Sequence, residues 1–235
     1  PREFWEELPY KSRLKKLDGV FDEKLENISG SNAMDIAQDM INSTINNKVS
    51  TITGSLNIVS EDVQLSNSNG LELADESTYI TGIINAESEF GNIPVSGIGH
   101  ASGRTLLNFS AERIGKDAKN MCIKAINPQK IDSGKYSIIF EPYSVGELLA
   151  FVVAANFNFK TFSEKKSCFS NDLDKKIGID ELNLIDDPHI PEGIGTKSID
   201  DEGIETQKRN LIENGIFKNT FSNLYDSFKE GVKST

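Results

Sequence analysis

The chain has 235 residues, of which 37% are hydrophobic and 26% are charged. This length and apolar content allow a sizeable core and either one or two domains. The chain has 36 acidic and 25 basic residues and therefore a net charge of −11. This charge repels phosphate backbones and argues against a nucleic-acid partner. No apolar run reaches the length of a membrane span. Two cysteines argue against a disulfide framework and indicate a reducing, cytoplasmic environment.

The first part of the chain begins with a polar connector over residues 1–30. Residues 11–16 of this connector form a basic run in which no aromatic residues interleave, so a solvated connector is expected rather than a nucleic-acid contact. From Ser31 to about Ile45, apolar residues recur at helical spacing behind a serine cap. These features predict an amphipathic helix that covers one face of a sheet.

The sheet itself is expected between Val49 and Glu89, where polar and apolar residues alternate and Asn69-Gly70 offers a left-handed turn. Residues 93–103 are rich in glycine and predict a loop. A second amphipathic helix is expected over residues 110–126. The order helix, antiparallel strands, helix predicts a two-layer α/β domain, which we assign to residues 1–133.

The second predicted domain, residues 134–235, is organised around a helix. Ser144 and Glu147 have the spacing of a capping box, which places the start of the helix at Val145. The run Leu148 to Ala155 is apolar on every side, so the helix is expected to be buried.

Three further segments complete the predicted second domain. Residues 159–178 lack clear periodicity and predict a long mobile loop. Leu182 to Ile185 predicts a short strand, and residues 204–213 followed by Asn214-Gly215 predict a hairpin with a type I′ turn. The predicted fold class is therefore α+β, with an N-terminal α/β domain and an incomplete, mainly antiparallel β domain around one buried helix.

Several short motifs recur in the order and spacing of a known family. They are Phe4-Trp5-Glu6-Glu7-Leu8-Pro9, Ser66-Asn67-Ser68-Asn69-Gly70, Asp187-Pro188-His189, Ser198 to Gly203 and Leu211 to Ile216. Together with the strand, proline and helix over residues 135–158, they resemble the TldD/PmbA family of peptide-maturing proteases, once described as modulators of DNA gyrase. Family members begin earlier and continue beyond a Ser-Thr pair such as Ser234-Thr235. The resemblance thus implies that this chain is the middle of a longer protein.

The family's zinc motif has a counterpart in this sequence. In the TldD branch a leucine pair precedes His-Glu-x-x-x-His, which binds zinc through two imidazoles and uses the glutamate as general base. Here the leucine pair is followed by Ala150, Phe151 and Ala155 at those positions. The resemblance therefore implies the PmbA/TldE branch, with no catalytic residue and no metal in this chain. It implies a zinc-bearing TldD-like partner or a second copy of this chain, and a peptide substrate.

An acidic run gives the candidate contact residues. Asp200, Asp201 and Glu202 form either a turn whose carboxylates accept backbone hydrogen bonds or a contact to a peptide or partner chain, with His189 nearby in sequence. An alternative function is a self-sufficient hydrolase that uses Asp186-Asp187 or Asp200-Asp201 together with His189.

Other chemical patterns are weak. Gly97 to Gly103 departs from both phosphate-loop fingerprints. His100 and His189 are the two histidines of the chain, too few for a zinc site. Cys122 is expected in a core, and Cys168 is expected as an exposed thiol without an activating histidine.

Overall fold

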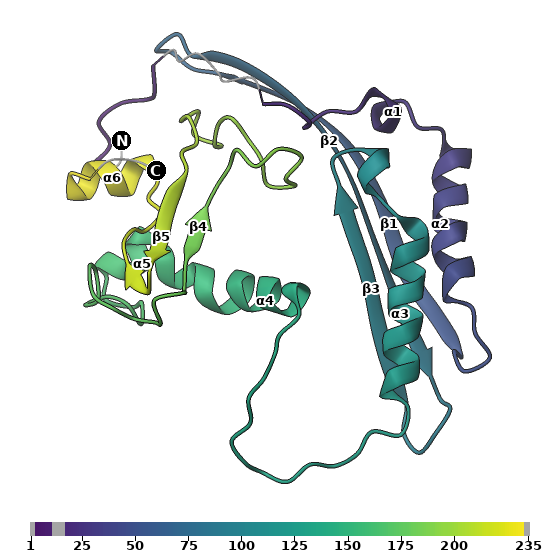
Figure 1. Ribbon diagram of the computed structural model, residues 1–235. Coiled ribbons are helices and arrows are strands. Elements are labelled where there is room, and N and C mark those ends of the chain that lie inside the picture. Colours follow the sequence, from purple (N-terminus) through teal and green to yellow (C-terminus); the bar gives the residue numbers. More distant parts are fainter. Residues whose placement is uncertain (1–2, 11–16, 233–235) are drawn as a thin grey trace.

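The structure is a computed structural model that describes residues 3–10 and 17–232. Helices and two antiparallel three-stranded sheets form a mixed α+β fold (Figure 1), which confirms the predicted class. The basic run at residues 11–16 and the Ser234-Thr235 pair lie outside the described residues. No helix in the described ranges is long and apolar enough to cross a lipid bilayer.

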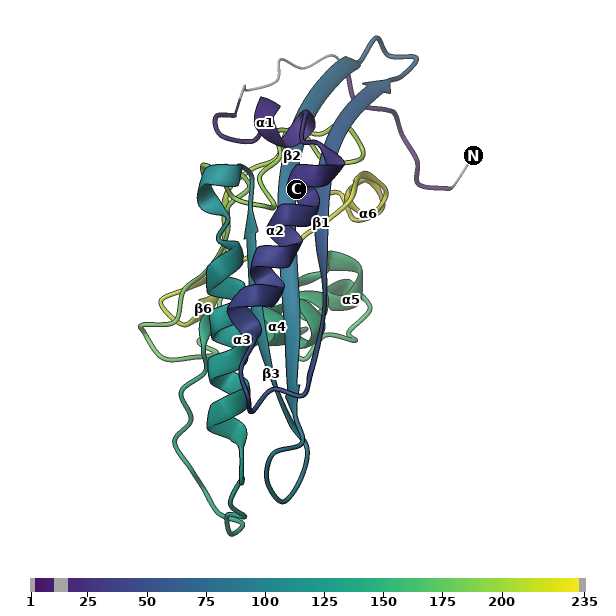
Figure 2. The ribbon, with the colours of Figure 1, turned by 90° about the vertical axis from the view of Figure 1, so that its right-hand side faces the viewer.

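The N-terminal half is a layer of helices on a sheet with the order β1-β2-β3. Helices α2 and α3 lie side by side on one face of this sheet (Figure 2). The long hairpin of β1 and β2 is paired from Thr51↔Glu87 to Ser66↔Glu72. The bounds are α1 Glu23–Glu26, α2 Gly30–Thr44, β1 Thr51–Ser66, β2 Glu72–Ser88, β3 Val95–Gly103, a 3-10 turn Leu106–Asn108 and α3 Ala111–Ala125.

Serine caps define where both long helices begin. The Ser29 side chain accepts a hydrogen bond from the backbone N–H of Asn32, and Ser110 accepts one from Arg113. Each serine satisfies a donor that the first helical turn leaves free. The cap of α2, Ser29, thus lies two residues before the predicted cap Ser31, whereas α3 begins as predicted. Between the helices and the sheet lies a core of Met40, Ile84, Ala86, Ile114, Ala118 and Cys122.

The predicted glycine-rich loop at residues 93–103 is wrong, because most of it is strand β3, antiparallel to β2. The glycines in this strand permit close packing with α3. A Cβ atom on Gly97 would overlap backbone atoms of Ala118 and Cys122, and one on Gly99 would overlap the Ile114 carbonyl oxygen. Glycine serves here to bring helix and strand backbones together rather than to give flexibility.

The C-terminal half has a sheet with the order β4-β5-β6, in which all three strands are short. Asn214 and Gly215 have φ angles of 49° and 75°, which confirms the predicted tight turn between β5 and β6. Helices and turns contribute more residues than strands, so the expectation of a mainly β domain is wrong. The bounds are α5 Phe159–Ser163, β4 Leu184–Asp186, β5 Arg209–Glu213, β6 Ile216–Phe217 and α6 Leu224–Glu230.

Aromatic rings form the core of this half. Phe157, Leu211, Ile212 and Phe217 are buried, and Phe162, Phe169 and Ile177 pack against them. The prediction of a long mobile loop over residues 159–178 is therefore wrong. Its phenylalanines lack a regular period because they enter the core from a short helix and successive turns, not from one long element.

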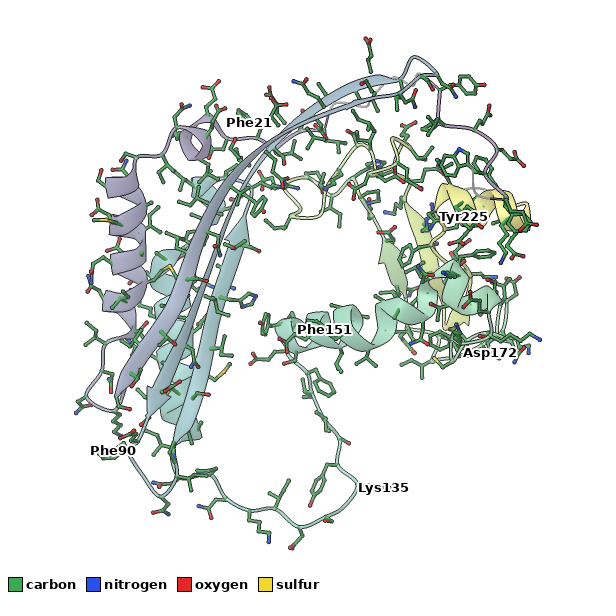
Figure 3. All side chains as sticks on the ribbon, turned by 180° about the vertical axis from the view of Figure 1, so that it is seen from behind. Phe21, Phe90, Lys135, Phe151, Asp172 and Tyr225 are labelled. Carbon is green, nitrogen blue, oxygen red and sulfur yellow. The ribbon has the colours of Figure 1, made fainter. Side chains whose placement is uncertain are left out.

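The helix at the centre of the predicted second domain is present but not buried. It consists of α4, Pro142–Leu148, a π-helical turn, Leu149–Val153, and a 3-10 turn, Ala154–Phe157. Phe151 is 83% exposed and lies on the part of the helix between the two halves (Figure 3). Phe157 at the end lies in the aromatic core, and Val153, one turn earlier, packs against that core. The apolar composition of this helix favours burial, but the other described residues leave much of its surface exposed.

The start of this helix also differs from the prediction. Glu141 is the N-cap residue and makes no side-chain capping bond, and Pro142 occupies the first turn, where its missing N–H costs nothing. Ser144 lies inside the helix, so the predicted capping box is wrong. The strand expected before this helix is also wrong: residues 136–140 have no regular secondary structure and no strand partner among the described residues, and Ile139 within them is 97% exposed.

Candidate functional site

The acidic run lies in a tight turn between the two halves of the chain. Ile199 and Glu205 form an isolated antiparallel bridge that closes this turn. A carboxylate oxygen of Asp200 accepts hydrogen bonds from the backbone N–H groups of Glu202 at 2.9 Å and Ile204 at 2.8 Å. Asp200 therefore shapes the turn, as the simpler of the two interpretations of the sequence predicts.

The other two acids of the turn differ from each other. A carboxylate oxygen of Glu202 accepts a 2.8 Å hydrogen bond from the backbone N–H of Leu224, at the first residue of α6. Glu202 thus stabilises the start of that helix. Asp201 is exposed and makes no hydrogen bond or ion pair with any described residue. Of the three acids, Asp201 alone is free to meet a ligand.

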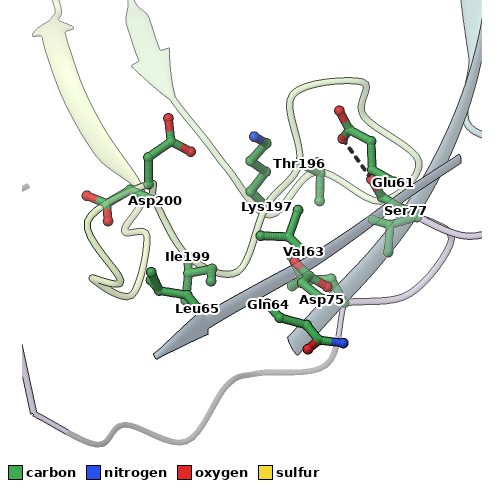
Figure 4. Close-up of a pocket in the computed structure, with 13 residues that line it drawn as sticks. Glu61, Val63, Gln64, Leu65, Asp75, Ser77, Thr196, Lys197, Ile199 and Asp200 are labelled. Carbon is green, nitrogen blue, oxygen red and sulfur yellow. Dashed lines mark hydrogen bonds between the residues drawn. The ribbon is translucent and has the colours of Figure 1, made fainter. Parts of the chain in front are cut away.

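A cavity of about 260 Å³ lies between this turn and the end of the β1–β2 hairpin (Figure 4). Residues of both halves line it. Its apolar lining residues are Leu17, Val20, Val63, Leu65 and Ile199, and its charged lining residues are Glu61, Asp75, Lys197, Asp200 and Asp201. Four carboxylates face one ammonium group, so the cavity carries a negative potential.

The carboxylates of this cavity have only hydroxyl and backbone partners. Glu61 accepts a hydrogen bond from the Ser77 hydroxyl at 3.4 Å, and Asp75 accepts one from the Ser198 hydroxyl at 3.3 Å. None of the four takes part in an ion pair within residues 3–10 and 17–232. Arg104 interacts electrostatically with Glu61 and Asp75, and the charge that these interactions do not balance is left for a ligand or for solvent.

Arg104 joins the two halves beside this cavity. Its side chain is buried, with 2% of the residue exposed. The guanidinium donates to the carbonyl oxygens of Thr78, Gly193, Ile194 and Thr196 at 3.3, 3.0, 2.5 and 3.0 Å. Burial lowers the pKa of Arg104, and the nearby carboxylates of Glu61 and Asp75 oppose that shift. Because Arg104 holds residues 193–196, it positions one wall of the cavity.

A second hollow, of about 490 Å³, is lined by Asp186, Thr206 and Arg209 among others and shares Lys197, Ile199, Asp200 and Asp201 with the first cavity. Burial raises the pKa of Asp186, while Arg209 opposite it in the sheet lowers that pKa. The neighbouring Asp187 forms an ion pair with Lys208 at 2.7 Å, and this contact and the backbone N–H of His189 lower its pKa. The pKa values of these adjacent aspartates are thus shifted in opposite directions, upward for Asp186 and downward for Asp187.

The two histidines have separate surroundings. The ring of His100 packs against Tyr143 at a tilt of 46° with a centroid distance of 4.0 Å, whereas Nε2 of His189 lies 3.2 Å from the Thr206 hydroxyl. No group of three or more His, Cys, Asp or Glu side chains in the described ranges is placed to hold a metal ion. Cys122 is buried and Cys168 is exposed.

The positions of the zinc motif fall on the irregular part of the central helix. Ala150 and Phe151 lie in the π-helical turn, and Ala155 lies in the 3-10 turn that follows. The backbone N–H of Ala154 bonds to the Leu149 carbonyl, five residues earlier. This spacing brings residues five apart to one side of the helix, which an ordinary α-helix does not.

Sequence reasoning missed Arg104, Glu61 and Asp75. Arg104 follows a glycine-rich strand and has no motif around it, and most of its partners lie about 90 positions away in the sequence. The local sequence offers one weak signal: the end of the β1–β2 hairpin is rich in polar and acidic residues. Many exposed hairpins share this property.

Comparison with known proteins shows which protein family this chain resembles. Residues 133–235 match the family profile described as the PmbA/TldA metallopeptidase C-terminal domain. The chain is 30% identical over 135 residues to metalloprotease PmbA of Escherichia coli, covering 57% of this chain and 30% of that protein. It is 24% identical over 230 residues to an uncharacterized protein of Methanocaldococcus jannaschii, covering 97% of this chain and 53% of that protein.

Solved structures share the fold. TldE from Thermococcus kodakarensis superposes with a TM-score of 0.82 at 21% identity, covering 100% of this chain and 53% of that one. A proposed modulator of a DNA gyrase from Thermotoga maritima gives a TM-score of 0.92 at 22% identity, covering 100% and 54%. Over residues 133–235 the chain is similar to the PmbA/TldD family. It spans about half the length of these full-length relatives.

Proposed function

We propose that this chain belongs to a PmbA/TldE-like subunit without a catalytic metal, in a cytoplasmic metallopeptidase assembly that processes or degrades unfolded or modified peptides. The zinc would come from a TldD-like partner, and a second copy of this chain is the other candidate partner. The observation that carries the proposal is the occupation of the zinc-motif positions by Ala150, Phe151 and Ala155. Methyl and phenyl groups cannot ligate a cation.

The backbone at these positions supports the alignment on which the proposal depends. Two ligands five residues apart are separated by about 140° around an α-helix, and a π-helical turn reduces that separation because its hydrogen bonds join residues five apart. This chain has such a turn at Leu149–Val153. The helix therefore has a backbone suited to an i,i+5 ligand pair, although it carries no ligands.

The cavity beside the acidic turn supports a role in handling peptides. It is lined by backbone segments and side chains of both halves, and its carboxylates lack cationic partners among the described residues. A subunit of this kind contributes walls and contacts to a shared chamber, while the partner supplies the chemistry.

Zinc content and reconstitution test the proposal. The purified protein is expected to hold well under one equivalent of zinc by elemental analysis and to cleave no peptide alone. Mixing the full-length protein with a zinc-bearing TldD-like subunit should give a complex on size exclusion and restore cleavage. A triple variant, Ala150→His with Phe151→Glu and Ala155→His, is expected to gain zinc affinity. Stoichiometric zinc in the unmodified chain, or no complex and no gain of cleavage on mixing, would overturn the proposal.

The alternative is a self-sufficient hydrolase. The raised pKa of Asp186 in the larger hollow, with His189 beside Thr206, is the observation in its favour. Cleavage by the purified chain alone that survives chelator and is lost in Asp186→Asn and His189→Gln would establish this alternative in place of the subunit proposal.

A further inference from the structure

We infer that the cavity between the acidic turn and the β1–β2 hairpin binds one basic side chain, lysine or arginine, of an extended peptide. That the peptide is a substrate depends on the function proposed above, whereas the binding of the side chain does not. The inference joins three properties of the cavity: its apolar residues, its excess of carboxylates that form no ion pair among the described residues, and its small size.

The floor and the rim suit different parts of a long basic side chain. Val63, Leu65 and Ile199 offer apolar surface, against which the methylene stem of lysine or arginine can pack. Carboxylates of Asp75 and Asp201 lie in the same lining and can accept hydrogen bonds from a cationic head group. An acidic or purely polar side chain would satisfy neither surface.

The volume limits what can enter. Sites for whole small molecules usually measure about 300–1,000 Å³, and this cavity measures about 260 Å³. One side chain fits this space better than a cofactor or several residues of a peptide. The remainder of the peptide would lie outside the cavity, in contact with solvent.

The charges argue against other ligands. Glu61, Asp75, Asp200 and Asp201 against Lys197 leave an excess of negative charge, which excludes an anion. A bare divalent cation needs several converging carboxylates, and no three acidic, histidine or cysteine side chains of the described ranges are grouped to hold a metal. An organic cation with an apolar stem remains as the ligand that matches both the charge and the floor.

Asp201 provides the sharpest variant for a test. It lines the cavity and, unlike Asp200 and Glu202, has no hydrogen bond that the turn or α6 requires. Asp201→Asn therefore removes charge without removing a structural contact. Glu205→Gln is the matched control, because Glu205 is an exposed acid of the same turn that lines neither hollow.

The experiment is an NMR titration of the purified, ¹⁵N-labelled chain with terminally blocked peptides Gly-Gly-X-Gly-Gly, where X is lysine, norleucine or glutamate. The lysine peptide is expected to shift amide signals of residues that line the cavity, with an affinity about fivefold above that of the norleucine peptide. Asp201→Asn should weaken lysine binding about threefold and Glu205→Gln should not change it. Raising the salt from low to physiological concentration should weaken binding as well.

Several results would overturn the inference. They are equal affinity for lysine and norleucine peptides, shifts confined to other parts of the chain, or lysine binding that Asp201→Asn leaves unchanged. The titration uses this chain without a protease, so its outcome is separate from the zinc and mixing experiments. Failure of lysine binding with successful reconstitution would remove only this inference, and the reverse result would remove only the subunit proposal.

Discussion

The guanidinium of Arg104 donates a 3.0 Å hydrogen bond to the carbonyl oxygen of Thr196, although the two residues lie 92 positions apart. The contact connects the end of β3 to the segment that leads into the acidic turn. A buried cation is held here by carbonyl dipoles rather than by a carboxylate within ion-pair distance. Arg104 thus links the two halves through three acceptors in residues 193–196, beside the Asp75–Ser198 and Asn108–Glu192 hydrogen bonds.

Replacing Arg104 by methionine is expected to lower the free energy of unfolding by about 3 kcal/mol or more, because it leaves several buried carbonyl groups without a donor. Urea unfolding followed by circular dichroism measures this change. Arg113→Met is the control, since Arg113 forms an exposed ion pair with Asp117 at 3.5 Å and should cost less than about 1 kcal/mol. Equal losses in the two variants would contradict the role assigned to Arg104.

Two glycine-to-alanine substitutions should change the stability of the fold in opposite directions. At Gly99 a methyl group would overlap the Ile114 carbonyl oxygen, whereas at Gly146, within α4, a methyl group would meet nothing within 4 Å. Gly99→Ala is therefore expected to destabilise the fold by about 1–3 kcal/mol, and Gly146→Ala to stabilise it by about 0.5–1 kcal/mol. Thermal unfolding of both variants decides this, and a neutral Gly99→Ala would show that α3 can move away from β3.

The pKa shifts of Asp186 and Asp187 predict that their contributions to stability depend on pH in opposite directions. Burial raises the pKa of Asp186, so its contribution to stability is greatest below the unfolded pKa of about 3.9 and falls as the pH rises through the folded pKa. The pKa of Asp187 is lowered by Lys208 and by the N–H of His189. Its contribution is therefore present above the unfolded pKa and is lost as the pH falls through the folded pKa.

Urea titrations between about pH 3 and pH 7 separate these two contributions. Relative to the unmodified chain, Asp186→Asn should become more stable as the pH rises, and Asp187→Asn should become less stable. Parallel stability curves for the two variants would show that these neighbours do not differ as their surroundings indicate.

Glu202 should matter for stability rather than for ligand binding. Its carboxylate accepts the N–H of Leu224 at 2.8 Å, and Glu202→Ala is expected to cost about 1 kcal/mol, as for loss of a helix cap. Glu205→Ala removes an exposed acid from the same turn and should change stability by less than about 0.5 kcal/mol. If the two variants unfold at the same urea concentration, Glu202 does not support α6.

Two phenylalanines allow a test of where the C-terminal core lies. Phe217 is fully buried and its ring packs with those of Phe157, Phe162 and Phe169, so Phe217→Asp should prevent folding of this half. Phe151 is largely exposed, so Phe151→Asp in this chain should leave a cooperative unfolding transition within about 1 kcal/mol of the original. Loss of the fold in Phe151→Asp would mean that the central helix is covered after all.

Several features set by neighbouring residues could be predicted from the sequence, although the caps expected at Ser31 and Ser144 are wrong because a nearby residue begins each helix instead. The Ser110 cap needs only the first turn of its helix, and the Asn214-Gly215 turn needs only residues that accept positive φ. The acidic turn at Asp200 is equally local, because its carboxylate bonds to N–H groups two and four residues later.

Features set by distant residues could not be predicted. Gly97 and Gly99 indicated a loop, since nothing in the sequence shows that α3 packs directly on them. The apolar run around Phe151 indicated burial, although cover depends on what lies opposite it. The junction at Arg104 and the cavity beside it arise only when segments about 90 positions apart meet.

The uncovered segment Tyr136–Phe140 has a practical consequence for handling this chain. Its sequence, Tyr-Ser-Ile-Ile-Phe, has high β-propensity and no charge, and Ile138, Ile139 and Phe140 are all largely exposed. An exposed segment of this kind, which belongs to no strand among the described residues, offers backbone and side chains for pairing between molecules. Concentrated solutions are expected to aggregate through this segment, and Ile139→Lys, which places a charge at its most exposed side chain, should raise the concentration at which the protein stays dispersed.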